Sequence, residues 1–389
     1  MLVLVKGNIN MKAMAILSGG HATTDLSQGA VAALLVFWRP ELDLTYTEVT
    51  AIVLVATFAS SLVQPIFGMW SDRQGTAMLL PAGAALSGIG IALASVAPSY
   101  PILLLCVFVS GLGVAAYHPE ASKFASYVSG KRRAGGMSLF SIGGNLGFAI
   151  GPLLASTLVL SLGLKGGLLL AVPPVILAVV LMFAVPYMTR FVPTEVVQKD
   201  EKSKRDQPFA LFVLLAIVSL RSVGHMGLFA FIPLWEVSQG EGAGYGNRIL
   251  FLFLVAGVVG TLIGGPLADR IGTRTVTGMS HALAVPLILL YVLVEGTAGV
   301  IAVTFAGGLL IATFAVTIVM SHDYLPNRVG LASGLTIGLS IGLGGVAAVV
   351  LGGIADTVGL KTAVLATASG PALAAFLTLL LPRVSRDAT

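Results

Sequence analysis

Long apolar runs, separated by short polar clusters, constrain the fold of this chain more than any other feature of its sequence. An α-helix of about 20 apolar residues is long enough to cross the hydrocarbon core of a bilayer. Backbone groups in lipid must hydrogen-bond within their own segment, so each run is expected to be a helix. We predict an all-α integral membrane protein with twelve spans, near residues 13–38, 46–70, 76–97, 101–126, 134–161, 166–188, 209–235, 247–268, 274–294, 298–320, 329–354 and 361–381.

The composition supports this class and excludes several others. Only 10% of the 389 residues are charged and 56% are apolar, whereas about a quarter of a soluble domain is charged. The net charge of +5 does not indicate nucleic-acid binding, because the basic residues flank the apolar runs. Cys106 is the single cysteine, which excludes a disulfide framework. The sequence shows no metal-ligand spacing, nucleophile motif or phosphate-binding loop, so we expect neither an enzyme nor a metal or organic cofactor.

The placement of Lys and Arg predicts the orientation of the chain, because cytoplasmic loops carry an excess of these residues. With both termini in the cytoplasm, sixteen of the 22 basic residues lie inside and four lie outside. The other two, Lys123 and Arg221, fall within spans. The opening apolar run is too short for a signal peptide, and the sequence leaves Met1 or Met11 as the start.

The longest polar segment divides the predicted spans into two groups of six. Residues 189–208 hold nine charges and are expected to form a flexible cytoplasmic linker. The predicted domains are therefore an N-terminal half, 1–188, and a C-terminal half, 209–389.

The two halves share the motif G-x-x-x-D-R-x-G, which appears after the second span and again after the eighth. The two copies are offset by 197 residues and consist of Gly68, Asp72, Arg73 and Gly75, and of Gly265, Asp269, Arg270 and Gly272. A repeat at half the chain length indicates a duplicated six-helix unit, as in transporters whose halves rock about a central site. A single copy of the motif would equally fit an ordinary turn whose basic residues lie on the cytoplasmic side of the membrane.

This repeated motif resembles the loop motif of the major facilitator superfamily. The resemblance implies two pseudo-symmetric six-helix halves and alternating-access transport of a small molecule by a monomer in the bilayer. It also implies that Asp72, Arg73, Asp269 and Arg270 belong to a cytoplasmic gate and not to the substrate site.

A second motif lies in the fifth span and reads Gly143-Gly144-Asn145-Leu-Gly147-Phe-Ala-Ile-Gly151-Pro152. Small residues four apart let helices approach closely, and proline can bend a helix. Gly147, Gly151 and Pro152 resemble the motif of proton-coupled drug antiporters, although the following Ala155 and Ser156 stand where that motif prefers glycine. Antiport and helix packing alone are both open interpretations.

Three further segments resemble the fosmidomycin resistance branch of the superfamily: His21–Gly29, Tyr117–Lys123 and Ser138–Asn145. The resemblance implies efflux across a bacterial inner membrane and adds Gln28 and Asn145 to the candidate site. Thr24 stands where that branch leads us to expect Asn, and no proline follows Gly29. The identity of the substrate therefore stays open.

Ionisable side chains at bilayer depth are costly and indicate function. His21 and Asp25 lie four residues apart in the first span, and Arg221 and His225 repeat this spacing in the seventh. Each pair therefore shares one helix face. Because the first and seventh spans correspond in the duplicated halves, we expect the four side chains to face one central polar site.

An exchange of protons for substrate at this site is the leading hypothesis. Arg221 would bind an anionic substrate through two parallel hydrogen bonds. Asp25 would then lose its cation and take up a proton. The alternatives are a permanent Asp25–Arg221 ion pair that only holds the halves together, uptake of an organic acid or other nutrient, and a receptor without transport.

His118 and Glu120 lie near the cytoplasmic end of the fourth span. One interpretation places them at the end of the transport pathway, with His118 as a proton relay. The other is that Glu120 forms an ion pair with Lys123 three residues later.

Overall fold

The computed structural model describes residues 8–74, 77–130, 132–192 and 206–382, and these residues form helices and no β-strand. The predicted all-α fold is thus confirmed. Ten helical segments in this part of the chain are long and apolar enough to cross a membrane. Two further helices correspond to predicted spans: α1, which is more polar than the ten, and α4, which has only 16 residues.

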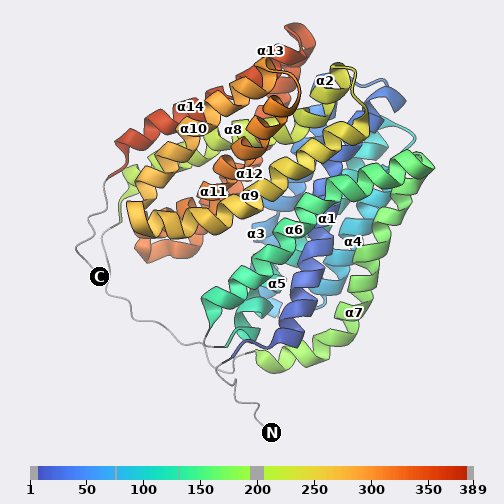
Figure 1. Ribbon diagram of the computed structural model, residues 1–389. Coiled ribbons are helices and arrows are strands. Elements are labelled where there is room, and N and C mark those ends of the chain that lie inside the picture. The colour runs from blue at the N-terminus through green and yellow to red at the C-terminus, as the bar shows by residue number, and fades with distance from the viewer. Residues whose placement is uncertain (1–7, 75–76, 131, 193–205, 383–389) are drawn as a thin grey trace. The chain divides into compact units, whose positions relative to one another are not determined.

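In the first half, the helices follow the predicted spans with ends shifted by a few residues (Figure 1). The predicted span 46–70 is divided by a π-helical turn, and the span 166–188 begins as a 3-10 helix. The helices are α1 (Met11–Glu41), α2 (Tyr46–Thr57), the π-helical turn Phe58–Leu62, α3 (Gln64–Gln74), α4 (Leu79–Ala94), α5 (Tyr100–Val128), α6 (Arg133–Leu162), the 3-10 helix Leu164–Ala171, α7 (Val172–Met188) and the 3-10 helix Thr189–Phe191.

In the second half, the last predicted span is divided into two helices, with Gly370 and Pro371 at the start of the second. Proline lacks the N–H group that would continue the hydrogen-bond ladder. The helices are α8 (Pro208–Ser238), α9 (Ala243–Ile271), α10 (Thr273–Leu293), α11 (Thr297–Tyr324), the 3-10 helix Pro326–Arg328, α12 (Val329–Thr357), α13 (Leu360–Ala366), α14 (Ser369–Leu377) and the 3-10 helix Thr378–Leu380.

Contacts group the chain into two compact units. The first contains Met1–Asp43 and Val55–Asp200, and the second contains Leu44–Leu54 and Glu201–Thr389. Most of α2 therefore belongs to the second unit, although it comes from the predicted N-terminal half. The linker predicted at 189–208 lies largely outside the described residues.

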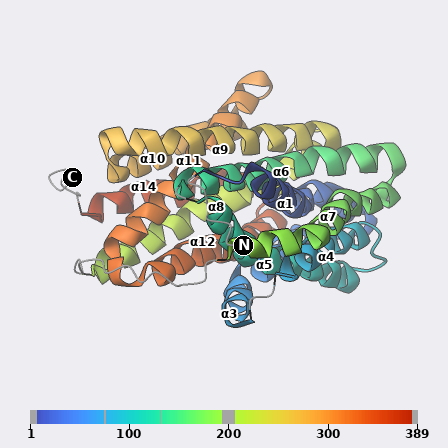
Figure 2. The same ribbon diagram turned by 90° about the horizontal axis from the view of Figure 1, so that it is seen from below.

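The pairing of α1 with α6 is the most extensive in the first unit, and Figures 1 and 2 show the two helices side by side. A β-carbon added at Gly143, Gly147 or Gly151 would overlap the backbone carbonyl of Ser18, Ala22 or Leu26, respectively. Three glycines spaced four apart thus face three α1 carbonyls spaced four apart. Close helix contact requires small residues at such positions, so this motif has a packing role.

In the second unit, the extensive pairs are α9 with α11, α10 with α11, and α8 with α12. The start of α2 is fixed to the end of α12 by the Asp356 carboxylate. It accepts hydrogen bonds from the backbone N–H groups of Tyr46 (2.8 Å) and Thr47 (2.9 Å). Thr45 and Glu48 form a reciprocal capping box at the same helix end. All four of these N–H groups therefore have acceptors.

Candidate functional site

His21 and Asp25 form the first part of the candidate site, on one face of α1. Asn10 starts this helix, because its side chain accepts a hydrogen bond from the Ala13 N–H group. His21 Nε2 lies 3.2 Å from Asp25 Oδ2, and their side chains are only 11% and 16% exposed. The spacing of four residues thus brings the two together as predicted.

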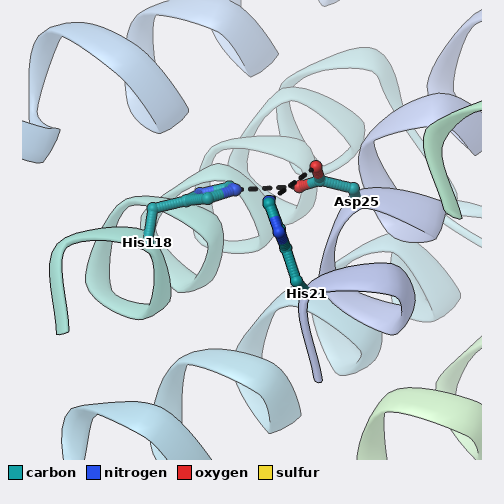
Figure 3. A group of neighbouring side chains, drawn as sticks. All are labelled: His21, Asp25 and His118. Atoms are coloured by element: carbon teal, nitrogen blue, oxygen red, sulfur yellow. Dashed lines mark ion pairs between the residues drawn. The ribbon is translucent and has the colours of Figure 1, made fainter. Parts of the chain in front are cut away.

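His118 of α5 completes the group, as Figure 3 shows. Its Nε2 atom lies 3.1 Å from Asp25 Oδ1, so each oxygen of one carboxylate faces a different imidazole. The two imidazole rings meet edge to face, with centroids 4.9 Å apart. The sequence placed His118 at the end of a pathway; the structure places it against Asp25.

The two imidazoles are held in place by backbone carbonyls. His21 Nδ1 lies 2.9 Å from the Phe140 carbonyl oxygen, and the Phe140 ring stacks on His21 at 4.1 Å. His118 Nδ1 lies 2.9 Å from the Val114 carbonyl oxygen. A β-carbon at Gly144 would overlap Nε2 and Cε1 of His21 and lie 2.7 Å from Asp25 Oδ2. Close approach of α6 to the group therefore depends on this glycine.

The other residues predicted for the first half lie outside this group. Gln28 donates a hydrogen bond from Nε2 to Ser60 Oγ at 2.9 Å. Glu120 is buried, and Lys123 Nζ lies 2.8 Å from its Oε2 atom, so the predicted ion pair is present. Asn145 is exposed, and Pro152 is buried within α6.

Arg221 lies buried in the second unit, on α8, and its guanidinium hydrogen-bonds to two hydroxyl groups. It donates hydrogen bonds from Nη2 to Ser340 Oγ at 2.9 Å and from Nη1 to Thr313 Oγ1 at 3.5 Å. The guanidinium also lies over the Phe314 ring, 5.3 Å from its centroid. Among the described residues of this unit, no carboxylate lies within ion-pair distance of Arg221.

His225 follows Arg221 by one helical turn, but its ring stacks on Phe253 with centroids 5.7 Å apart. Its buried Nε2 atom has no hydrogen-bond partner among the residues that the structure describes. The sequence did not predict the hydroxyl partners Ser340 and Thr313, because serine and threonine are common in apolar helices and carry no spacing signal.

The two copies of the repeated motif are described to different extents. Gly75 and the side chains of Asp72 and Arg73 lie outside the described residues, whereas Gly68 lies within α3. Asp269 and Arg270 are exposed in the last turn of α9, and Gly265 lies earlier in that helix. Gly272 ends α9 with a φ of 96°, a conformation that favours glycine.

Comparisons with known proteins agree with this fold. The family model of the Major Facilitator Superfamily matches residues 17–348. YfnC, an MFS-type transporter of Bacillus subtilis (strain 168), is 30% identical over 377 residues, which cover 93% of this chain and 90% of the relative. The fosmidomycin resistance protein of Escherichia coli (strain K12) is 31% identical over 363 residues, which cover 90% of this chain and 88% of that protein.

A solved structure with a similar fold is a bacterial homolog of the human lysosomal transporter Spinster, in an inward-facing and unoccupied conformation. The TM-score is 0.80 at 15% identity, and the match covers 97% of this chain and 99% of that chain. Together with the apolar helices, these matches define a multi-pass membrane protein with the fold of transporters and not of enzymes. The chain belongs to the major facilitator superfamily, and its sequence is similar to the fosmidomycin resistance branch.

Proposed function

We propose that this protein exports a small anionic or amphiphilic compound, such as a fosmidomycin-like antibiotic, in exchange for protons. The observation that carries the proposal is the buried group of Asp25 between His21 and His118. Ionisable groups at bilayer depth mark ion and proton pathways, and histidine changes its charge near neutral pH. The E. coli relative, which is named for fosmidomycin resistance, supports efflux of this type of compound.

Arg221 is the proposed anchor for the negative charge of the substrate. Its hydroxyl partners hold the guanidinium in place without neutralising it. Guanidinium binds carboxylate or phosphonate through parallel hydrogen bonds. In the proposed cycle, an anion binds Arg221 and a proton binds the Asp25 group in turn. The transporter switches between its inward-open and outward-open states as the two alternate. The proton gradient supplies the energy, and no organic cofactor takes part.

The direction of transport and its coupling are tested together in inverted vesicles of bacterial inner membrane, the proposed location. An exporter accumulates fosmidomycin when the vesicle lumen is acidic, whereas a proton-coupled importer of organic acids does not. The Asp25→Asn variant should lose this gradient-driven accumulation and keep exchange of labelled for unlabelled substrate. Full-rate accumulation by Asp25→Asn would refute the proton-carrier role.

A further inference from the structure

Three ligand-type atoms from different parts of the sequence converge in the first unit. They are Nε2 of His21, Nε2 of His118 and a carboxylate oxygen of Asp25, and all lie within 4.8 Å of one another (Figure 3). The sequence showed no metal-ligand spacing because two ligands come from α1 and the third comes from α5.

The backbone determines which nitrogen of each ring carries a hydrogen. Both Nδ1 atoms lie 2.9 Å from backbone carbonyl oxygens, of Phe140 and of Val114. A carbonyl only accepts hydrogen bonds, so each Nδ1 must be the donor. In a neutral imidazole the Nε2 atom then carries a lone pair. Both lone pairs would point at the oxygens of Asp25, which are also electron-rich.

Such an arrangement is favourable only with positive charge between the three side chains. Histidines that bind a metal through one ring nitrogen usually donate a hydrogen bond from the other to a backbone carbonyl or carboxylate. The Nδ1 contacts of His21 and His118 are of this kind. The N···O distances of 3.1 and 3.2 Å, each to a different oxygen of Asp25, are slightly shorter than the roughly 3.4 Å between neighbouring ligands of a tetrahedral zinc ion with bonds of about 2.1 Å.

Gly144 lets α6 lie close to the ligand atoms without placing a side chain on them. A β-carbon at this position would fall on the ligand atoms His21 Nε2 and Asp25 Oδ2. A side chain at position 144 would therefore block these atoms from the α6 side, while the Phe140 ring of the same helix stacks on His21.

We propose that His21, Asp25 and His118 bind one Zn²⁺ ion through two imidazole Nε2 atoms and one carboxylate oxygen, with a fourth position left open. Two histidines and one carboxylate form a common ligand set for zinc sites with an open position. The ion would occupy the same atoms as the proposed proton, so Zn²⁺ should inhibit transport; only this inhibition rests on the proposed function.

Binding is tested on the purified full-length protein in detergent, stripped of metal with a chelator and titrated with Co²⁺ as a coloured substitute for zinc. One Co²⁺ ion per chain should bind and produce visible d–d absorption that Zn²⁺ then abolishes. His21→Gln and His118→Gln should each weaken binding by about tenfold or more. His322→Gln is the matched control, because His322 on α11 lies 2.6 Å from Ser333 Oγ and belongs to the second unit.

The inference fails if wild type binds Co²⁺ no more tightly than His118→Gln, or if His322→Gln loses binding equally. It also fails if the group holds only protons, because no Co²⁺ spectrum then develops. Size-exclusion chromatography verifies that each variant folds. If a histidine variant does not fold, the nearly isosteric Asp25→Asn variant tests metal binding in its place. Export without Co²⁺ binding would refute the metal site alone, and Co²⁺ binding without export would refute the proposed function alone.

Discussion

Gly144 of α6 lies so close to the His21 ring of α1 that a β-carbon at position 144 would overlap that imidazole. Replacing Gly144 by alanine should therefore displace His21 from Asp25. Overpacking of a close contact typically lowers stability by about 1–3 kcal/mol. We expect Gly144→Ala to unfold at a lower temperature and to lose most gradient-driven transport in vesicles.

Gly135→Ala is the control for this substitution in the same helix. A β-carbon there would lie 3.8 Å from Ile9 Cδ1, an ordinary van der Waals contact. Alanine also favours a helix over glycine by about 1 kcal/mol. Gly135→Ala should thus keep both stability and transport, and equal losses in the two variants would contradict the assigned role of Gly144.

Arg221→Lys should weaken binding of an anionic substrate while it keeps the positive charge. Lysine cannot form the paired hydrogen bonds of a guanidinium, and a net hydrogen bond to a charged group is worth about 1.5–3 kcal/mol. We expect roughly a tenfold to hundredfold loss of fosmidomycin affinity, measured by titration calorimetry. The exposed Arg248 offers the control Arg248→Lys, which should bind as wild type does; unchanged affinity of Arg221→Lys would exclude Arg221 as the anchor.

Asp356→Ala should loosen the first turn of α2. The substitution removes the acceptor of the Tyr46 and Thr47 N–H groups, and loss of a helix cap costs about 1 kcal/mol. Hydrogen–deuterium exchange in residues 44–54 should therefore accelerate about fivefold, which is the factor that corresponds to about 1 kcal/mol. Asp43→Asn, at an exposed position with a φ of 49° that asparagine tolerates, should leave this exchange unchanged.

The sequence predicted the helices well because the length and apolarity of each run decide whether it forms a helix in lipid. The spacing of four residues also predicted that His21 meets Asp25. It did not predict the contact of His118 with Asp25. That contact depends on the rotation and depth of α5 against α1, which side-chain packing sets and a single sequence does not display.

The hydroxyl groups around Arg221 illustrate the same limit. Ser340 comes from α12 and Thr313 from α11, so their approach to α8 depends on how three helices pack. The predicted partnership of Arg221 with Asp25 stays a prediction. Within its own unit, Arg221 contacts hydroxyl groups, and within the other unit, Asp25 contacts histidines.

The polar face of α1 has a consequence for how this protein is made. His21, Thr24, Asp25 and Gln28 make α1 less apolar than the ten helices that could enter a bilayer on hydropathy alone. The insertion machinery favours segments whose transfer into lipid is downhill, and a central Asp opposes transfer by about 2.5–3.5 kcal/mol. We therefore expect α1 to be retained at the translocon until the glycine face of α6 has been synthesised, so that stable integration of the first helix awaits a later one.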